Sequence, residues 1–116
     1  MEIVEKAWGR EVIFANNDMY CGKKLIHDKA GSKGSMHFHM KKHETFYVES
    51  GSFRIRWINV VDASIHSNII HQGQTWENAP GQPHQLEALE DNSVIIEVST
   101  THYDNDSYRV MPGDSQ

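Results

Sequence analysis

The sequence contains a single cysteine, Cys21, and no long apolar run. One thiol cannot form an intramolecular disulfide, so the chain lacks the framework that stabilises many small secreted domains. The first residues lack the basic segment followed by an apolar stretch that marks a secretory leader, and no stretch reaches the length needed to cross a bilayer. We therefore expect a soluble protein of a reducing cytoplasm, with no membrane partner.

The chain also lacks an excess of positive charge, since its formal net charge is -5. Proteins that bind nucleic acids in general need a dominant cationic face, so this balance argues against a nucleic-acid partner. Locally the balance inverts, because segment 23–42 contains six lysines and one acidic residue, Asp28. A binding site beside this segment would favour a small anionic substrate, such as a sugar phosphate or a carboxylate. The alternative is that these lysines line solvated strand faces.

No segment shows a sustained 3.6-residue apolar period with helix caps. Instead, short stretches of alternating residues are separated by turn-prone residues, and they predict strands over 23–27, 44–48, 52–58, 65–70, 86–89 and 94–98. Short strands at fairly regular spacing predict an all-β sandwich or barrel. A chain of 116 residues has room for one core, so we expect a single domain over 1–116.

What the chain does contain is a compact group of metal-ligating residue types. His37 and His39 are two residues apart, so on a strand their imidazoles would project from the same face. A tight turn around 40–42 would return strand 44–48 antiparallel to the first strand and bring Glu44 to the same point. His84 is a fourth candidate, and imidazole and carboxylate groups are ligands that first-row divalent metals prefer.

The predicted ligand set of three imidazoles and one carboxylate suits several ions. Zinc is the first candidate, with manganese, iron, nickel or cobalt as alternatives. A five- or six-coordinate ion would keep one or two positions for water or a substrate oxygen. His43 should point to the opposite strand face from Glu44, so we expect it outside the site. The other histidines are interpreted as ordinary surface or strand residues (His27, His66 and His71) or left open (His102).

The spacing of these residues resembles the first sequence motif of the cupin superfamily, which is matched at every fixed position: Gly31, His37, His39, Glu44 and Gly51. The second cupin motif is matched in part, at Gly73, Gly81 and His84, while Ala79 and Ala88 replace its proline and asparagine. The resemblance implies a double-stranded β-helix, the cupin jelly-roll barrel. It also implies that His37, His39, Glu44 and His84 bind a divalent transition metal.

Several short segments also resemble the cupin domain of type II mannose-6-phosphate isomerases, namely 6–9, 35–48, 80–84 and 96–100, together with Asp104, Asp106 and Arg109. This resemblance implies a metal-dependent aldose–ketose isomerase of a phosphorylated or acidic sugar. It places Arg109 near the substrate, with Lys42 as a candidate anion partner, and no residue stands out as the base. That family often has glutamine at the position of His37 and arginine at that of Lys42, and its C-terminal Tyr-Gly-Arg is absent here.

Two other functional classes are left open by the same ligand set. An Fe(II)-dependent cupin dioxygenase would use the free positions for oxygen and would require Fe(II) for activity. A non-catalytic cupin would recognise a sugar without transforming it. The resemblance to small cupins also implies a homodimer that either covers an exposed sheet face or exchanges N-terminal strands.

Overall fold

A computed structural model describes residues 1–114 of the chain, which form eleven strands. The strands are β1 (Glu2–Lys6), β2 (Gly9–Asn16), β3 (Cys21–His27), β4 (Met36–Phe38), β5 (Glu44–Ser50), β6 (Ser52–Ile58), β7 (Ile65–His71), β8 (Thr75–Asn78), β9 (His84–Ala88), β10 (Ser93–Ser99) and β11 (Tyr108–Met111). Residues 1–114 contain no helix of the length and hydropathy that a membrane span requires.

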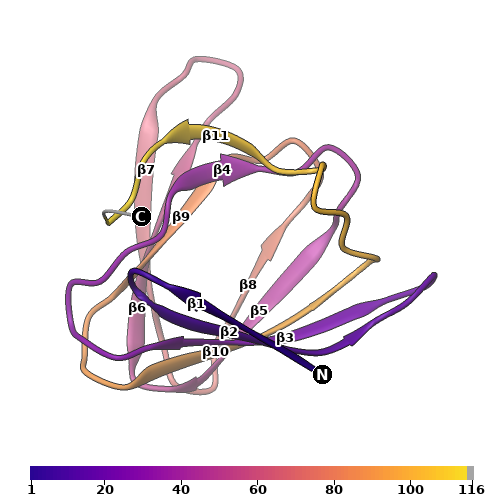
Figure 1. Ribbon diagram of the computed structural model, residues 1–116. Coiled ribbons are helices and arrows are strands. Elements are labelled where there is room, and N and C mark those ends of the chain that lie inside the picture. Colours follow the sequence, from indigo (N-terminus) through magenta and orange to yellow (C-terminus); the bar gives the residue numbers. More distant parts are fainter. Residues whose placement is uncertain (115–116) are drawn as a thin grey trace.

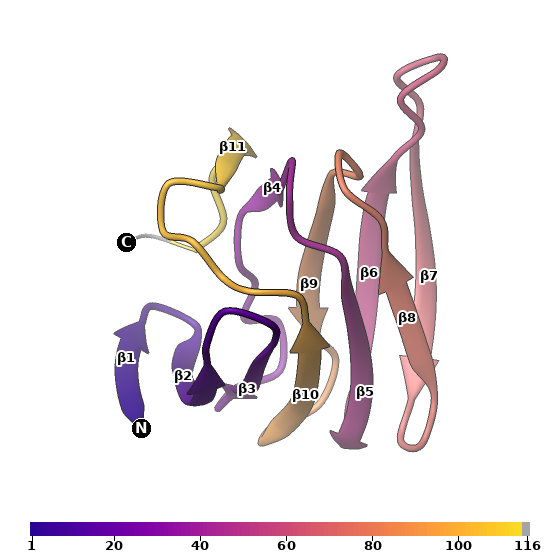
Figure 2. The same cartoon turned by 90° about the vertical axis from the view of Figure 1, so that its right-hand side faces the viewer.

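The strands form two antiparallel sheets that face each other across the interior (Figures 1 and 2). One sheet has the order β1-β2-β3-β10-β5-β8, and the other has the order β11-β4-β9-β6-β7. The hairpin of β6 and β7 extends beyond the rest of the barrel (Figure 2). The predicted all-β architecture is confirmed, and it is the jelly-roll barrel that the cupin resemblance implies.

Alternation along the strands explains why the predicted ones form. On β6, Phe53 and Ile55 are fully buried, while Arg54 and Arg56 point outward and lie 3.7 and 2.8 Å from a carboxylate oxygen of Glu87 on β9. The six strands predicted from alternation correspond to β3, β5, β6, β7, β9 and β10. The sequence analysis missed β1, β2, β8 and β11; β1 and β11 in particular have no buried side chains that would produce an alternating pattern.

The interior is packed by a cluster of buried apolar side chains from both sheets: Trp8, Leu25, Phe46, Val48, Phe53, Ile55, Ile70, Leu86, Ala88 and Ile95. The chain passes from one sheet to the other at Gly51, between β5 and β6. Gly51 has a φ of +73°, and a Cβ there would lie 2.1 Å from the Ser93 hydroxyl. Only glycine fits this corner without displacing its neighbour.

The predicted pairing of the two histidine-motif strands is wrong. Strand β4 pairs with β9 and β11, whereas β5 lies in the other sheet, between β10 and β8. Segment 39–43 crosses between the sheets instead of forming a hairpin. The Asp106 carboxylate holds this crossing, because it accepts hydrogen bonds from the backbone N–H groups of Met40, Lys41 and Lys42.

Candidate metal centre

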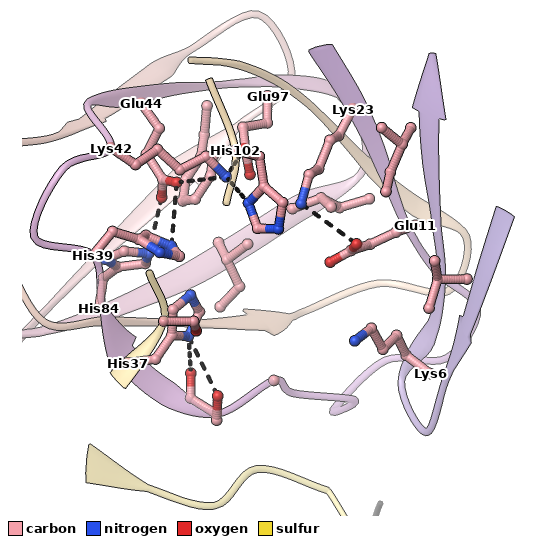
Figure 3. Close-up of a pocket in the computed structure, with 18 of the residues that line it drawn as sticks. Lys6, Glu11, Lys23, His37, His39, Lys42, Glu44, His84, Glu97 and His102 are labelled. Carbon is pink, nitrogen blue, oxygen red and sulfur yellow. Dashed lines mark hydrogen bonds and ion pairs between the residues drawn. The ribbon is translucent and has the colours of Figure 1, made fainter. Parts of the chain in front are cut away.

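Three histidines converge on one point at one end of the barrel interior. His37 on β4 is paired directly with His84, the first residue of β9, and His39 follows the end of β4. One ring nitrogen from each of the three lies within 4.8 Å of the other two. Figure 3 shows the three side chains grouped on one side of a cavity. The structure thus brings three of the four predicted ligands into a group that could hold a metal ion, and Glu44 is not a member of that group.

Each of these histidines has its second ring nitrogen occupied by a backbone carbonyl. Nδ1 of His37 lies 3.0 Å from the Ser35 oxygen, Nδ1 of His84 lies 2.9 Å from the Gln82 oxygen, and Nδ1 of His39 contacts the Asp106 oxygen. A carbonyl only accepts hydrogen bonds, so each neutral imidazole must carry its proton on Nδ1. The lone pair is then on Nε2, and this arrangement orients the imidazoles of metal-binding histidines.

The Glu44 carboxylate lies against two of these nitrogens, those of His84 and His39. Its Oε2 is 2.9 Å from Nε2 of His84 and accepts a hydrogen bond of 3.1 Å from the Asn78 side chain, while its Oε1 is 3.7 Å from Nε2 of His39. Oε1 of Glu44 is buried and has no hydrogen-bond partner among the described residues, whereas Nε2 of His84, also buried, faces Oε2 of Glu44. Buried polar atoms normally have partners, and a bound cation would provide one for Oε1 of Glu44.

The pKa shifts favour the neutral, metal-binding form at two of the three histidines. Burial lowers the pKa of His37 to about 3, with a further contribution from His84 and His39, and burial also lowers the pKa of His39. Burial acts in the same direction on His84, but the adjacent Glu44 carboxylate outweighs it and leaves the pKa of His84 raised. Burial alone would raise the pKa of Glu44, yet His84, Lys42 and His39 hold it below its ordinary value. A metal must therefore compete with a proton at His84.

The donor set of three imidazoles and an adjacent carboxylate fits a divalent transition metal. Zinc, manganese, iron, nickel and cobalt all accept such ligands, and the geometry does not select one of them. The histidines would supply nitrogen donors, and Glu44 is placed where it could supply an oxygen donor.

The histidines open onto a cavity of about 330 Å³. Its opposite side is formed by β1, β2 and β3, from which Lys6, Glu11 and Lys23 reach toward the interior (Figure 3). The Lys23 ammonium lies 3.5 Å from the Glu11 carboxylate. Lys23 and Lys42 are the two lysines of segment 23–42 that line the cavity, and both contact carboxylates. The lysines of segment 23–42 therefore add no unpaired positive charge to the cavity.

A buried ion-pair network adjoins the metal centre. The Lys42 ammonium, only 3% exposed as a residue, lies 2.7 Å from Oε2 of Glu97, 3.7 Å from Oε1 of Glu44 and 3.2 Å from Nδ1 of His102. Burial would lower the pKa of Lys42, but the two carboxylates raise it. Burial and Glu44 raise the pKa of Glu97, and burial together with Lys23 and Lys42 lowers the pKa of His102 to about 4.

Glu97 and His102 were not identified as site residues from the sequence. The signal for Glu97 is a charged residue on the inward face of an otherwise apolar strand, since it alternates with buried Ile95 on β10. For His102 no local pattern exists, because it lies in the irregular segment between β10 and β11.

Arg109, which the resemblance to type II mannose-6-phosphate isomerases places near the substrate, lies on β11. It is paired with His37 across β11 and β4, so both side chains project from the same face, and it lines the cavity. His43 points away from the site and contacts Glu77 at 2.6 Å, as expected. His27 differs from the interpretation of an ordinary strand or surface residue, because it is buried, stacks on Trp8 and lines the cavity.

Comparisons with protein-family models and with curated proteins give no match. Among solved structures, CapF from Staphylococcus aureus, a capsular polysaccharide assembling protein, is 25% identical, with a TM-score of 0.83 over 95% of this chain and 31% of CapF. KdgF from Halomonas sp. is 20% identical, with a TM-score of 0.71 over 83% of this chain and 81% of KdgF.

An oxalate decarboxylase from Bacillus subtilis is 17% identical, with a TM-score of 0.82 over 94% of this chain and 30% of that chain. This chain thus spans about a third of the length of CapF and of the decarboxylase. The similar structures are cupin-fold proteins, and the chain has the jelly-roll fold of the cupin superfamily.

Proposed function

We propose that this protein is a metal-dependent aldose–ketose isomerase of a small phosphorylated or acidic sugar, similar to type II mannose-6-phosphate isomerases. The observation that supports it most is the convergence of three histidine ring nitrogens on the wall of a cavity that also contains carboxylate and cationic side chains. A site of this kind can bind the oxygens of a sugar and move a proton beside them.

In this proposal His37, His39 and His84 hold the ion, with Glu44 as the fourth ligand. When bound, a divalent metal supplies Lewis acidity to the carbonyl and hydroxyl oxygens of the sugar. Zinc is the first candidate, with manganese, iron, nickel or cobalt as alternatives. Asn78 holds the Glu44 carboxylate, and the Trp76 indole N–H donates in turn to Asn78 at 2.8 Å.

The anionic group of the substrate would meet Arg109 and Lys6. Both line the cavity, and neither forms an ion pair with a carboxylate within residues 1–114. Lys42, the anion partner proposed from the sequence, already faces two carboxylates. We therefore propose that Lys42 acts in catalysis through these carboxylates and that Arg109 contacts the substrate.

The test begins with protein purified without chelators or a metal-affinity tag. Elemental analysis identifies the ion, and the protein loaded with that ion is incubated with a panel of sugar phosphates and sugar acids in deuterated water. We expect interconversion of one aldose–ketose pair, with deuterium incorporated at the carbon next to the carbonyl. Absence of exchange with every sugar would overturn the proposal, and oxygen uptake that requires Fe(II) would favour a dioxygenase instead.

We also propose that the protein is a cytoplasmic homodimer. The outer face of the six-stranded sheet carries exposed apolar side chains, among them Phe14, Tyr47 and Val98. A second copy covering this face would remove them from water. Light scattering at micromolar concentration should give twice the chain mass of 13.3 kDa, and a monomeric mass would contradict the dimer.

A further inference from the structure

We propose that Glu97 is the catalytic residue that moves a proton between the two reacting carbons of the sugar, and that Lys42 is the positioning residue that holds its carboxylate. This inference rests on the proposed isomerase function. It assigns the catalytic base, for which the sequence analysis identified no candidate.

The position of Glu97 in the fold is the first support. It lies on the inward face of β10, where it is paired with Lys23 on β3 and with Phe46 on β5. The residue is 4% exposed and lines the cavity. Figure 3 shows its carboxylate beside Lys42 and His102, on the same side of the cavity as Glu44. A carboxylate buried this deeply is costly unless it is paired, and here Lys42 is its partner.

The Lys42 ammonium connects this carboxylate to the metal centre. It lies 2.7 Å from Oε2 of Glu97 and 3.7 Å from Oε1 of Glu44, so one ammonium group separates the two carboxylates. A sugar whose oxygens meet the histidine nitrogens would occupy the cavity that Glu97 also lines. The ammonium occupies one oxygen of Glu97, and Oε1 makes no hydrogen bond or ion pair with any residue of 1–114. That oxygen has lone pairs available to accept a proton.

The other titratable groups of the cavity are less suited to this step. Glu44 is committed to His84, His39 and Asn78. His102 has both nitrogens in use, because Nδ1 accepts from the Lys42 ammonium at 3.2 Å and Nε2 then donates to the Asp104 carboxylate at 3.2 Å.

Four other carboxylates line the cavity, and two of them, Glu2 and Asp104, are exposed to solvent, so Glu11 and Glu97 are compared. Glu11 lies across the cavity from the histidines (Figure 3), paired with Lys23. Glu97 lies on the side of Glu44, and burial favours its protonated form, which makes it a stronger base than an exposed glutamate. The position and environment of Glu97 thus favour it over Glu11.

The proposed step conserves atoms and electrons. The Glu97 carboxylate removes the proton from C2 of the aldose, the C–H electron pair becomes the C1–C2 double bond, and the carbonyl electron pair moves to O1. The hydroxyl proton passes from O2 to O1. Glu97, now a carboxylic acid, returns its proton to C1 while the carbonyl forms at C2, which gives the ketose and restores the carboxylate.

The test compares Glu97→Gln with Glu11→Gln in the metal-loaded protein, using the sugar that the wild type converts. Both substitutions remove one carboxylate that faces a lysine in the same cavity, so they differ in position and not in charge. We expect Glu97→Gln to lower kcat by about 100-fold or more with KM changed less than about threefold, and to abolish deuterium exchange at C2. Glu11→Gln should keep kcat within about threefold.

A second variant separates catalysis from folding. Glu97→Asp keeps the charge that pairs with Lys42 but withdraws it by one methylene, so we expect wild-type metal content and melting temperature with kcat lowered at least tenfold. The assignment would be overturned if Glu97→Gln kept kcat within tenfold, if Glu11→Gln lost as much activity, or if both Glu97 variants lost their metal. A wild type inactive on every sugar would refute the isomerase function instead, so the two failures are distinguishable.

Discussion

The two ends of the barrel interior are built from the same strands but from opposite kinds of side chain. At one end, the inward positions of β5 and β9 hold Glu44 and His84; two residues along each strand, they hold Phe46 and Leu86. On β10, Glu97 is paired with Phe46, and the next inward residue, Ile95, is buried among the apolar side chains. The apolar end stabilises the fold, since burial of such side chains is its main favourable term. The polar end costs stability unless its groups are paired. The contrast indicates that the rigid apolar end fixes the positions of the chemical groups at the other end.

The largest expected effect comes from removing a ligand at the polar end. His37→Ala should weaken metal binding by more than about 100-fold, because one of three nitrogen donors is lost and even outer residues contribute 10- to 100-fold. Isothermal titration of the metal-stripped protein measures this affinity. His43→Ala, which removes a nearby histidine that points outward, is the matched control and should bind as the wild type does. Wild-type affinity in His37→Ala would contradict the site.

At the apolar end, the expected effect is on folding. Phe53 is fully buried, so Phe53→Ala should lower the free energy of unfolding by about 3–5 kcal/mol. Urea denaturation followed by tryptophan fluorescence measures the change. Val61→Ala, at an exposed position, should change it by less than about 0.5 kcal/mol. A Phe53→Ala protein as stable as the wild type would show that the apolar end does not carry the stability assigned to it.

His27 is a polar group within the apolar end and should make stability depend on pH. Burial lowers its pKa to about 4 in the folded protein, whereas the pKa of histidine in the unfolded chain is about 6.5. As the pH falls, His27 therefore binds a proton in the unfolded chain before it does so in the folded protein. The free energy of unfolding is therefore unaffected by protonation of His27 above about pH 6.5. It decreases by about 3 kcal/mol as the pH falls from 6.5 to 4.

The stability difference between the wild type and His27→Gln isolates this effect, because the other histidines titrate in both proteins. The free energy of unfolding measured at pH 7.5 and at pH 4.5 should fall less in His27→Gln than in the wild type. Parallel curves for the two proteins would show that His27 is not the responsible group.

A smaller effect is expected from Asn78, which holds the Glu44 carboxylate from β8. Asn78→Ala should weaken metal binding by about 10- to 100-fold without abolishing it, because the ligands remain and only their orientation is lost. The same calorimetric titration measures it, with Asn68→Ala on exposed β7 as the control. An affinity equal to that of the wild type would show that Glu44 is not a ligand or needs no support.

The sequence was most informative where spacing translates directly into geometry. The alternation of Phe53 and Ile55 with Arg54 and Arg56 is a local property, and the strand it predicts is β6. The spacing of the histidines also predicted their convergence correctly, because metal-ligating residue types are uncommon and a group of them at short spacing is a specific signal. The convergence of His37, His39 and His84 is confirmed by the structure.

The sequence was least informative about relations that depend on pairing between distant strands. It predicted a hairpin between the strands of His37 and Glu44, whereas Asp106, more than 60 residues away in the chain, holds a crossing between the sheets. The contact of Lys42 with Glu97 likewise joins residues 55 positions apart. Such contacts are set by sheet order, which local periodicity does not contain.

X-ray absorption spectroscopy of the zinc-loaded protein reports the atoms that surround the ion and therefore tests the metal centre itself. We expect three imidazole nitrogens and one oxygen from the protein at about 2.0–2.2 Å, and loss of the imidazole signal in the His37→Ala, His39→Ala and His84→Ala triple variant. A zinc ion surrounded by oxygen atoms alone, or an unchanged spectrum in the triple variant, would contradict the account.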